Sequence, residues 1–201
     1  MPNKYEITQN TIKFGPHILY QIKALRNIRP ANDIFIPAGS LGGYIETESN
    51  LSQTDEAWIY ASAKVFDKAV VKDNAIVMNS ATILDHAVIE RNAVIKDNAS
   101  VRGFSRISDN ATIQDDAIAE DYCIVCGNAT IKDSALISAS AIVMGQAVIK
   151  DNAFLNDNAI ACDNAEIGGF ACLEGQAIVY DNGQINGHET ISGRTLLNKK
   201  F

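Results

Sequence analysis

Residues 70–99 read VVKDNAIVMNSATILDHAVIERNAVIKDNA, in which an alanine returns at every sixth position and is followed two places later by Val or Ile. The same period begins at Ala57 and continues to Glu189 without an insertion or a deletion. The last two positions of each repeat are mostly Asp, Asn, Gly or Ser. A fixed short period of this kind indicates a repeat architecture.

The length of the period favours strands over helices. A six-residue repeat does not keep one face of a helix with 3.6 residues per turn. In a strand, the first and third positions point to one side and the second and fourth to the other. Asn, Asp and Gly at the last two positions suit the backbone angles of a tight turn. The sequence therefore predicts short parallel strands that stack coil on coil at ~4.8 Å.

The repeat resembles the [LIV]-[GAED]-x-x-[STAV]-x signature of the left-handed parallel β-helix family. This resemblance implies an all-β fold of about 7–8 triangular coils with three hexapeptides each. Residues 39–60, GSLGGYIETESNLSQTDEAWIY, and the preceding LYQIKALRNI resemble the entry segment of YdcK-like hexapeptide-repeat proteins of bacteria and prophages, although Tyr44 stands where that group often has Trp. Such proteins are often labelled as acyltransferases by fold analogy. The resemblance implies the architecture and transfers no catalytic residue.

The chain is expected to divide into three parts. Residues 1–50 contain all four prolines and several strand-like runs, and we expect them to form a small N-terminal β cap over outward-facing apolar side chains of the first coils. Residues 51–195 are expected to form the β-helix, and residues 196–201 a C-terminal tail. Because no apolar run is long enough to span a membrane and no signal peptide is evident, a cytoplasmic location is predicted.

The net charge and the cysteine pattern limit the kinds of partner and ligand that we expect. The net charge is −7 and the pI is about 4.9, which argues against binding to nucleic acid or to an anionic membrane. The four cysteines do not form the two C-x-x-C pairs of a zinc site, and they are interpreted as reduced apolar residues: Cys123, Cys126, Cys162 and Cys172. No metal site is expected.

One set of outward-facing positions is apolar over four successive coils. A contiguous apolar patch of several hundred Å² on a soluble protein usually marks an interaction site, so we predict an oligomer interface. Burial of ~300 Å² on each of two copies at ~25 cal/mol per Å² would contribute about 15 kcal/mol before the costs of association. A flat stripe suits a two-fold dimer, whereas family analogy implies a trimer. A protein partner or a ligand groove is the other interpretation. The residues are Ile124, Cys126, Ile142, Met144, Ile160, Cys162, Ile178 and Tyr180.

Catalysis is the alternative function. Acyltransferases of the resembled family are trimers that bind CoA between adjacent prisms and use a histidine as general base. Of the three histidines, His17 belongs to the cap and His188 to the fading end of the repeat, so His86 is the one candidate on a well-formed coil. The sequence favours a non-catalytic oligomeric binding or scaffold protein without a cofactor, and the resemblance adds a phage or prophage origin. The alternative is an acyltransferase that uses acetyl-CoA or another acyl-CoA at a site between subunits.

Overall fold

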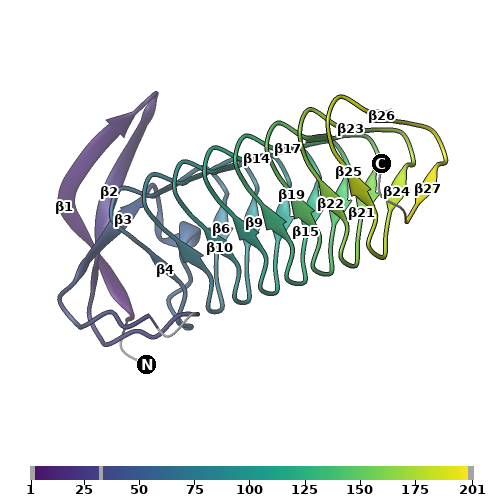
Figure 1. Cartoon of the computed structure of the whole chain (residues 1–201). Helices are drawn as coiled ribbons and strands as arrows, with labels where there is room; N and C mark the ends of the chain where they lie inside the picture. The colour runs from purple at the N-terminus through teal and green to yellow at the C-terminus, as the bar shows by residue number, and fades with distance from the viewer. Residues whose placement is uncertain (1–2, 32–33, 199–201) are drawn as a thin grey trace.

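The computed structural model describes residues 3–31 and 34–198, and its main body is a parallel β-solenoid (Figure 1). From Trp58 onward a two-residue strand recurs every six residues. Each strand pairs in parallel with the third strand after it, so that three successive strands complete one coil. The predicted all-β parallel fold is confirmed. The left-handed winding stays a prediction from the family resemblance.

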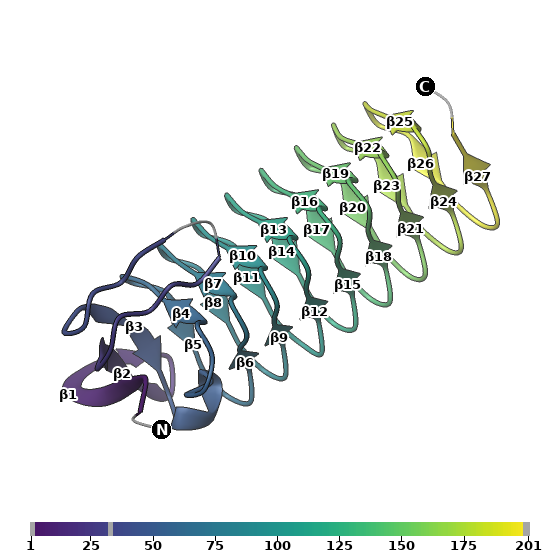
Figure 2. The ribbon, with the colours of Figure 1, turned by 90° about the horizontal axis from the view of Figure 1, so that it is seen from below.

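The strands form three columns, which are the three faces of the solenoid (Figure 2). The first face contains β4 (Trp58–Ile59), β7 (Ile76–Val77), β10 (Val94–Ile95), β13 (Thr112–Ile113), β16 (Thr130–Ile131), β19 (Val148–Ile149), β22 (Glu166–Ile167) and β25 (Gln184–Ile185). The second face contains β5 (Lys64–Val65), β8 (Thr82–Ile83), β11 (Ser100–Val101), β14 (Ile118–Ala119), β17 (Leu136–Ile137), β20 (Phe154–Leu155), β23 (Cys172–Leu173) and β26 (Thr190–Ile191). The third face contains β6 (Val70–Val71), β9 (Val88–Ile89), β12 (Arg106–Ile107), β15 (Ile124–Val125), β18 (Ile142–Val143), β21 (Ile160–Ala161), β24 (Ile178–Val179) and β27 (Leu196–Leu197).

The N-terminal segment adds an antiparallel part to the second face. β1 (Tyr5–Phe14) and β2 (His17–Ala24) form a hairpin, and β3 (Leu41–Ile45) pairs antiparallel with β2 and parallel with β5. A short 3₁₀ helix, η1 (Glu48–Asn50), leads from β3 to Leu51, which bridges to the third face. This irregular opening turn brings the solenoid to about nine turns, more than expected from the regular repeat alone.

Three outward-facing apolar side chains of the first coils are buried. Trp58 and Ile76 have no exposed surface although they occupy outward positions of the repeat, and Phe66 is also buried. At the other end, β27 lies inside the stretch expected as a tail, and residues 199–201 of that stretch lie outside the described residues. Among the described residues, no helix has the length and apolar content required to cross a membrane.

The core follows from the repeat. The small residues at position 1 and the branched residues at position 3 point inward, and nearly all of them have no exposed surface. Alanine at position 1 leaves room where the chain bends, while Val, Ile or Leu at position 3 fills the centre of the coil. Coils are joined by backbone hydrogen bonds such as that from the Ile124 amide to the Ala141 carbonyl, at 3.0 Å.

The corners are held by two polar columns. Residues at position 5 have positive φ, and most of them are Asp or Gly. Most of these Asp side chains accept a hydrogen bond from the backbone N–H one coil later, as Asp133 does from Asp151 at 3.1 Å. An amide ladder is also present, because Asn92 donates to Asn110 at 3.1 Å and Asn110 to Asn128 at 2.9 Å. These hydrogen bonds give partners to polar groups at the corners, namely backbone N–H groups and side-chain amides, that the strand pairing does not engage.

A substitution at one corner tests the aspartate column. Asp157 has φ of 56° and accepts the Gly175 N–H at 2.9 Å. Asp157→Ala should lower the free energy of unfolding by about 2 kcal/mol, because it removes this hydrogen bond and places a residue with a Cβ but no local hydrogen bond in the left-handed region. Asp157→Asn keeps an acceptor and should stay close to the wild type in urea titrations. Equal destabilisation by both variants would contradict the role of the acceptor.

Candidate functional site

The third face carries two adjacent rows of outward-pointing apolar side chains, which we call the apolar stripe. One row consists of Ile124, Ile142, Ile160 and Ile178, and the other of Cys126, Met144, Cys162 and Tyr180. The direct pairing of β15, β18, β21 and β24 places the members of each row side by side. Ile124 is 39% exposed and the other members are partly exposed. The structure therefore brings all eight predicted residues together on one surface.

The stripe extends further than the sequence indicated. Leu196 on β27 continues the isoleucine row and is 65% exposed. It was missed because the repeat loses its regular composition near the C-terminus, although its place one full coil after Ile178 is the signal that would have found it. A shorter outward row of the same kind lies on the second face, formed by Ile118, Leu136 and Phe154.

A charged cluster ends the stripe toward the N-terminus. Arg106 occupies the isoleucine row on β12 and forms an ion pair with Glu90, which also pairs with Lys72 at 2.9 Å. Burial by itself would raise the pKa of Glu90, but hydrogen bonds from Lys72 and Arg106 outweigh it and lower that pKa. The carboxylate is therefore ionised at neutral pH. The third face thus changes from an ion-paired surface to an apolar one between β12 and β15.

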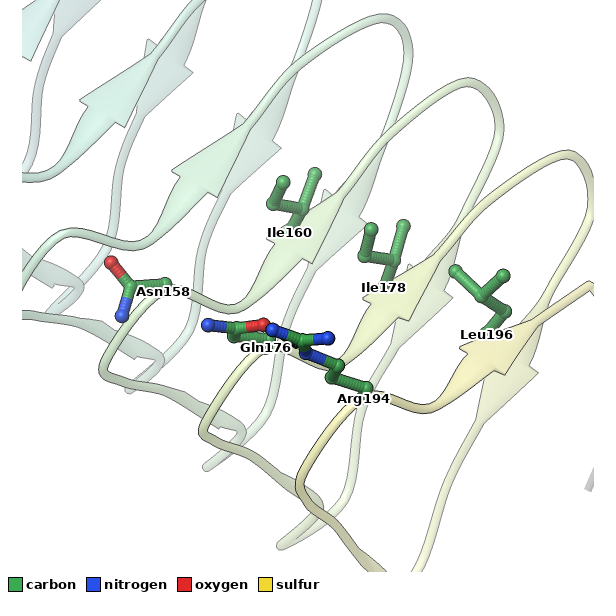
Figure 3. A pocket seen from close by; sticks show the side chains of 6 residues that line it. All are labelled: Asn158, Ile160, Gln176, Ile178, Arg194 and Leu196. Atoms are coloured by element: carbon green, nitrogen blue, oxygen red, sulfur yellow. Dashed lines mark hydrogen bonds between the residues drawn. The ribbon is translucent and has the colours of Figure 1, made fainter.

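A groove runs beside the C-terminal half of the stripe (Figure 3). Its volume is about 510 Å³, and it lies between an apolar row on strands and a polar row on the preceding turns. Arg194 donates from Nε to Oε1 of Gln176 at 2.9 Å within the polar row. The arrangement offers an apolar wall and a line of hydrogen-bonding groups. The lining residues are Asn158, Ile160, Gln176, Ile178, Arg194 and Leu196.

His86 lies on the corner between the second and third faces, where it begins an aromatic column. Its ring stacks on Phe104, with centroids 4.4 Å apart, and Phe104 stacks on Tyr122 at 5.1 Å. Phe104 is 52% exposed and Tyr122 62% exposed. Because Tyr122 lies two residues before Ile124, the column that begins at His86 ends at the edge of the stripe. Among the described residues, no side chain hydrogen-bonds to the His86 ring. The sequence identified His86 but missed the column, whose signal is an aromatic ring at the same place in successive coils.

The other two histidines also contact phenylalanines. His188 stacks on Phe170 with centroids 4.8 Å apart. His17 lies at the start of β2, packs against Phe66 at 4.7 Å, and contacts Glu46 through Nδ1 at 3.0 Å. The hydrogen bond with Glu46 raises the pKa of His17.

The four cysteines are free thiols. Burial raises the pKa of Cys123 to about 11, and burial also raises the pKa of Cys126 and Cys162 in the stripe and of Cys172 on the second face. A thiol with a raised pKa is largely protonated at neutral pH and is a weak nucleophile. In the stripe, Cys126 and Cys162 therefore contribute apolar surface.

Comparison with known proteins gives no family assignment: no family model matches the chain, and no curated protein shows significant sequence similarity to it.

Proposed function

We propose that the protein is a non-catalytic scaffold or binding protein of the left-handed hexapeptide-repeat type that self-associates through the apolar stripe. The observation that carries the proposal is the pair of adjacent apolar rows across β15, β18, β21 and β24 on the third face. A row of isoleucines exposed to water is unfavourable, and a second copy of the same surface would bury it. The stripe is flat and continuous, which suits an isologous two-fold contact.

The composition around the stripe supports an interface. Interfaces typically have an apolar centre and a polar rim. Here amides flank both long edges: Asn158 and Gln176 on the corner before the third face, and Asn164 and Asn182 on the corner after it. These amides are exposed and can pair across a two-fold axis. The exposed amides beside the stripe would therefore form the polar rim of the interface.

The stripe is large enough to form the apolar centre of a dimer interface, although not the whole interface. Five coils at ~4.8 Å, with two rows of side chains, offer roughly 300 Å² on each copy. The centre would contribute about 15 kcal/mol, against association costs of about 4–15 kcal/mol. Stable interfaces bury ~1,200–2,000 Å² in total, so the flanking turns must supply the remaining contact area.

Ile142→Asp tests the interface at its centre. Ile142 lies between Ile124 and Ile160 on paired strands, so a carboxylate there would be buried against a partner without a counter-charge. We expect the variant to be a monomer in light scattering while its circular dichroism keeps the β signal. Thr130→Asp is the matched control, because Thr130 holds the same repeat position on the first face. An unchanged mass for Ile142→Asp would contradict the interface.

The alternative function has its own test. A CoA-dependent acyltransferase with His86 as general base would bind acetyl-CoA, and calorimetric titration of the intact oligomer would detect that binding. Micromolar affinity for acetyl-CoA, together with acyl transfer lost in His86→Ala, would replace the scaffold proposal. Under the scaffold proposal we expect no heat of binding.

A further inference from the structure

Three side chains from separate parts of the chain meet where the cap contacts the first coil. His17 begins β2, Glu46 follows β3, and Asp67 lies in the turn after β5. His17 Nδ1 is 3.0 Å from Glu46 Oε1 and 3.9 Å from Asp67 Oδ1, and the three donor atoms lie within 4.8 Å of one another. We propose that this cluster is a binding site for a divalent transition-metal ion of the Zn²⁺ type.

Both carboxylates are already oriented for this role. Glu46 Oε2 accepts the Asp67 N–H at 2.8 Å, and Asp67 Oδ2 accepts the Asp85 N–H at 3.3 Å. Each carboxylate therefore has one oxygen held by the backbone, while its other oxygen faces His17 Nδ1. Metal ligands are commonly oriented by a second shell of hydrogen bonds in this manner. The orientation exists before any ion binds.

The local charge favours a cation. Neither Glu46 nor Asp67 forms an ion pair with Lys or Arg among the residues that the structure describes, and both face a single histidine. Coordination through His17 Nδ1 requires that this nitrogen release the proton that it shares with Glu46. The two carboxylates then carry two negative charges that a divalent ion would balance. Phe66 is buried against the His17 ring and shields one side of the cluster from water. The three side chains remain 22%, 29% and 34% exposed, which leaves a path of entry.

The distances and donor types fit a small divalent ion. Bonds of ~2.0–2.2 Å place neighbouring donors about 3.0–3.4 Å apart in tetrahedral or octahedral sites. The contact between His17 and Glu46 already has this length, and Asp67 Oδ1, which lies 3.9 Å from His17 Nδ1, must move closer to bind the same ion. One imidazole and two carboxylates suit Zn²⁺, and water would complete the coordination. A bound ion would link β2, the segment after β3 and the first coil, so that it fastens the cap to the solenoid.

The test is a titration of the chelator-treated protein with ZnCl₂. We expect calorimetry to show one ion per chain at this site, and a hundredfold excess over Kd to raise Tm by about 5 °C. His17→Gln keeps an amide that can donate to Glu46 but loses the imidazole ligand, and Asp67→Asn loses a carboxylate. Each should weaken Zn²⁺ binding at least tenfold.

Asp121→Asn is the matched control. Asp121 lies three coils beyond Asp67 in the same column and accepts the Ala139 N–H through Oδ2 at 3.1 Å, and it neither belongs to the cluster nor contacts it. Its substitution should leave Zn²⁺ affinity unchanged. Absence of binding to the wild type would overturn the proposal, as would binding through the partly exposed thiols that persists in His17→Gln.

A measurement on the wild-type protein covers the case in which the variants fail to fold. Imidazole resonances of His17, His86 and His188 can be followed by nuclear magnetic resonance and assigned with His86→Gln and His188→Gln. Zn²⁺ should shift the His17 signals and leave those of the other two histidines unchanged. Equal shifts of all three, or no shift of His17, would contradict the site.

Discussion

Gly43→Ala is expected to release the cap from the first coil and to lower the free energy of unfolding by about 2–3 kcal/mol. A Cβ at this position would lie 2.6 Å from the Ala63 carbonyl oxygen and 2.6 Å from Ile59 Cγ2. The carbonyl cannot move freely, because it accepts the Tyr44 N–H at 2.9 Å in the pairing of β3 with β5. Gly43 is thus required for close approach of two strands.

The measurement uses the single tryptophan of the chain. Trp58 has no exposed surface and its ring lies beside Gly42, next to Gly43. Release of the cap should therefore shift Trp58 fluorescence to the red before the solenoid unfolds in urea. Gly15→Ala is the control, since Gly15 has φ of 59° in the hairpin turn and an added Cβ would meet nothing within 4 Å. It should cost about 1 kcal/mol without a change in the Trp58 spectrum. An unshifted spectrum for Gly43→Ala would show that the cap tolerates the added methyl group.

The solenoid was predictable because its interactions repeat. Position 1 and position 3 each meet the same neighbours in every coil, so the six-residue pattern in residues 57–189 carries the strand, the turn and the inward face at once. The assumption of three hexapeptides per coil, taken from the family resemblance, then placed all members of the apolar stripe on one face. The stripe was found from sequence for the same reason as the fold.

The irregular features were not predictable in this way. Leu196 and the aromatic column of His86, Phe104 and Tyr122 obey the same spacing but differ in residue type from the rest of their columns. The cluster around His17 depends on a contact with Glu46 across 29 residues of non-repetitive sequence. Such contacts follow from how the hairpin packs on the first coil, and no periodic signal records that packing.

Asp55→Ala is expected to have the largest effect on stability, lowering the free energy of unfolding by about 3–5 kcal/mol. Lys4 has no exposed surface, and its Nζ is 3.1 Å from Asp55 Oδ1. Asp55 also accepts the Ala57 N–H at 3.1 Å and the Asp73 N–H at 2.6 Å. The substitution removes these bonds and leaves a buried ammonium group without its counter-charge, which is the costly way to break a buried ion pair.

Lys4→Met separates the two causes of this loss. It removes the buried charge and fills a similar volume, while Asp55 keeps its two backbone donors, so the cost should stay below about 1.5 kcal/mol. The double variant should then be more stable than Asp55→Ala alone, which urea titrations of the four proteins would measure. A double variant as unstable as the sum of the two single changes would show that the backbone bonds of Asp55, and not the stranded ammonium, dominate.

The pH dependence gives an independent check on the same pair. Burial lowers the pKa of Lys4 below its ordinary value of 10.5. Loss of the Asp55 carboxylate should lower this pKa further, because the charged form loses its partner. Between the folded and unfolded pKa values the unfolded chain binds more protons, so the stability contributed by this group rises with pH. The loss of stability caused by Asp55→Ala in the wild type should therefore shrink from pH 7 to pH 10. In the Lys4→Met background, the loss caused by the same substitution should not change with pH. A deficit independent of pH would mean that Lys4 reaches water when Asp55 is removed. The cap would then have rearranged, and no ammonium group would remain buried without a counter-charge.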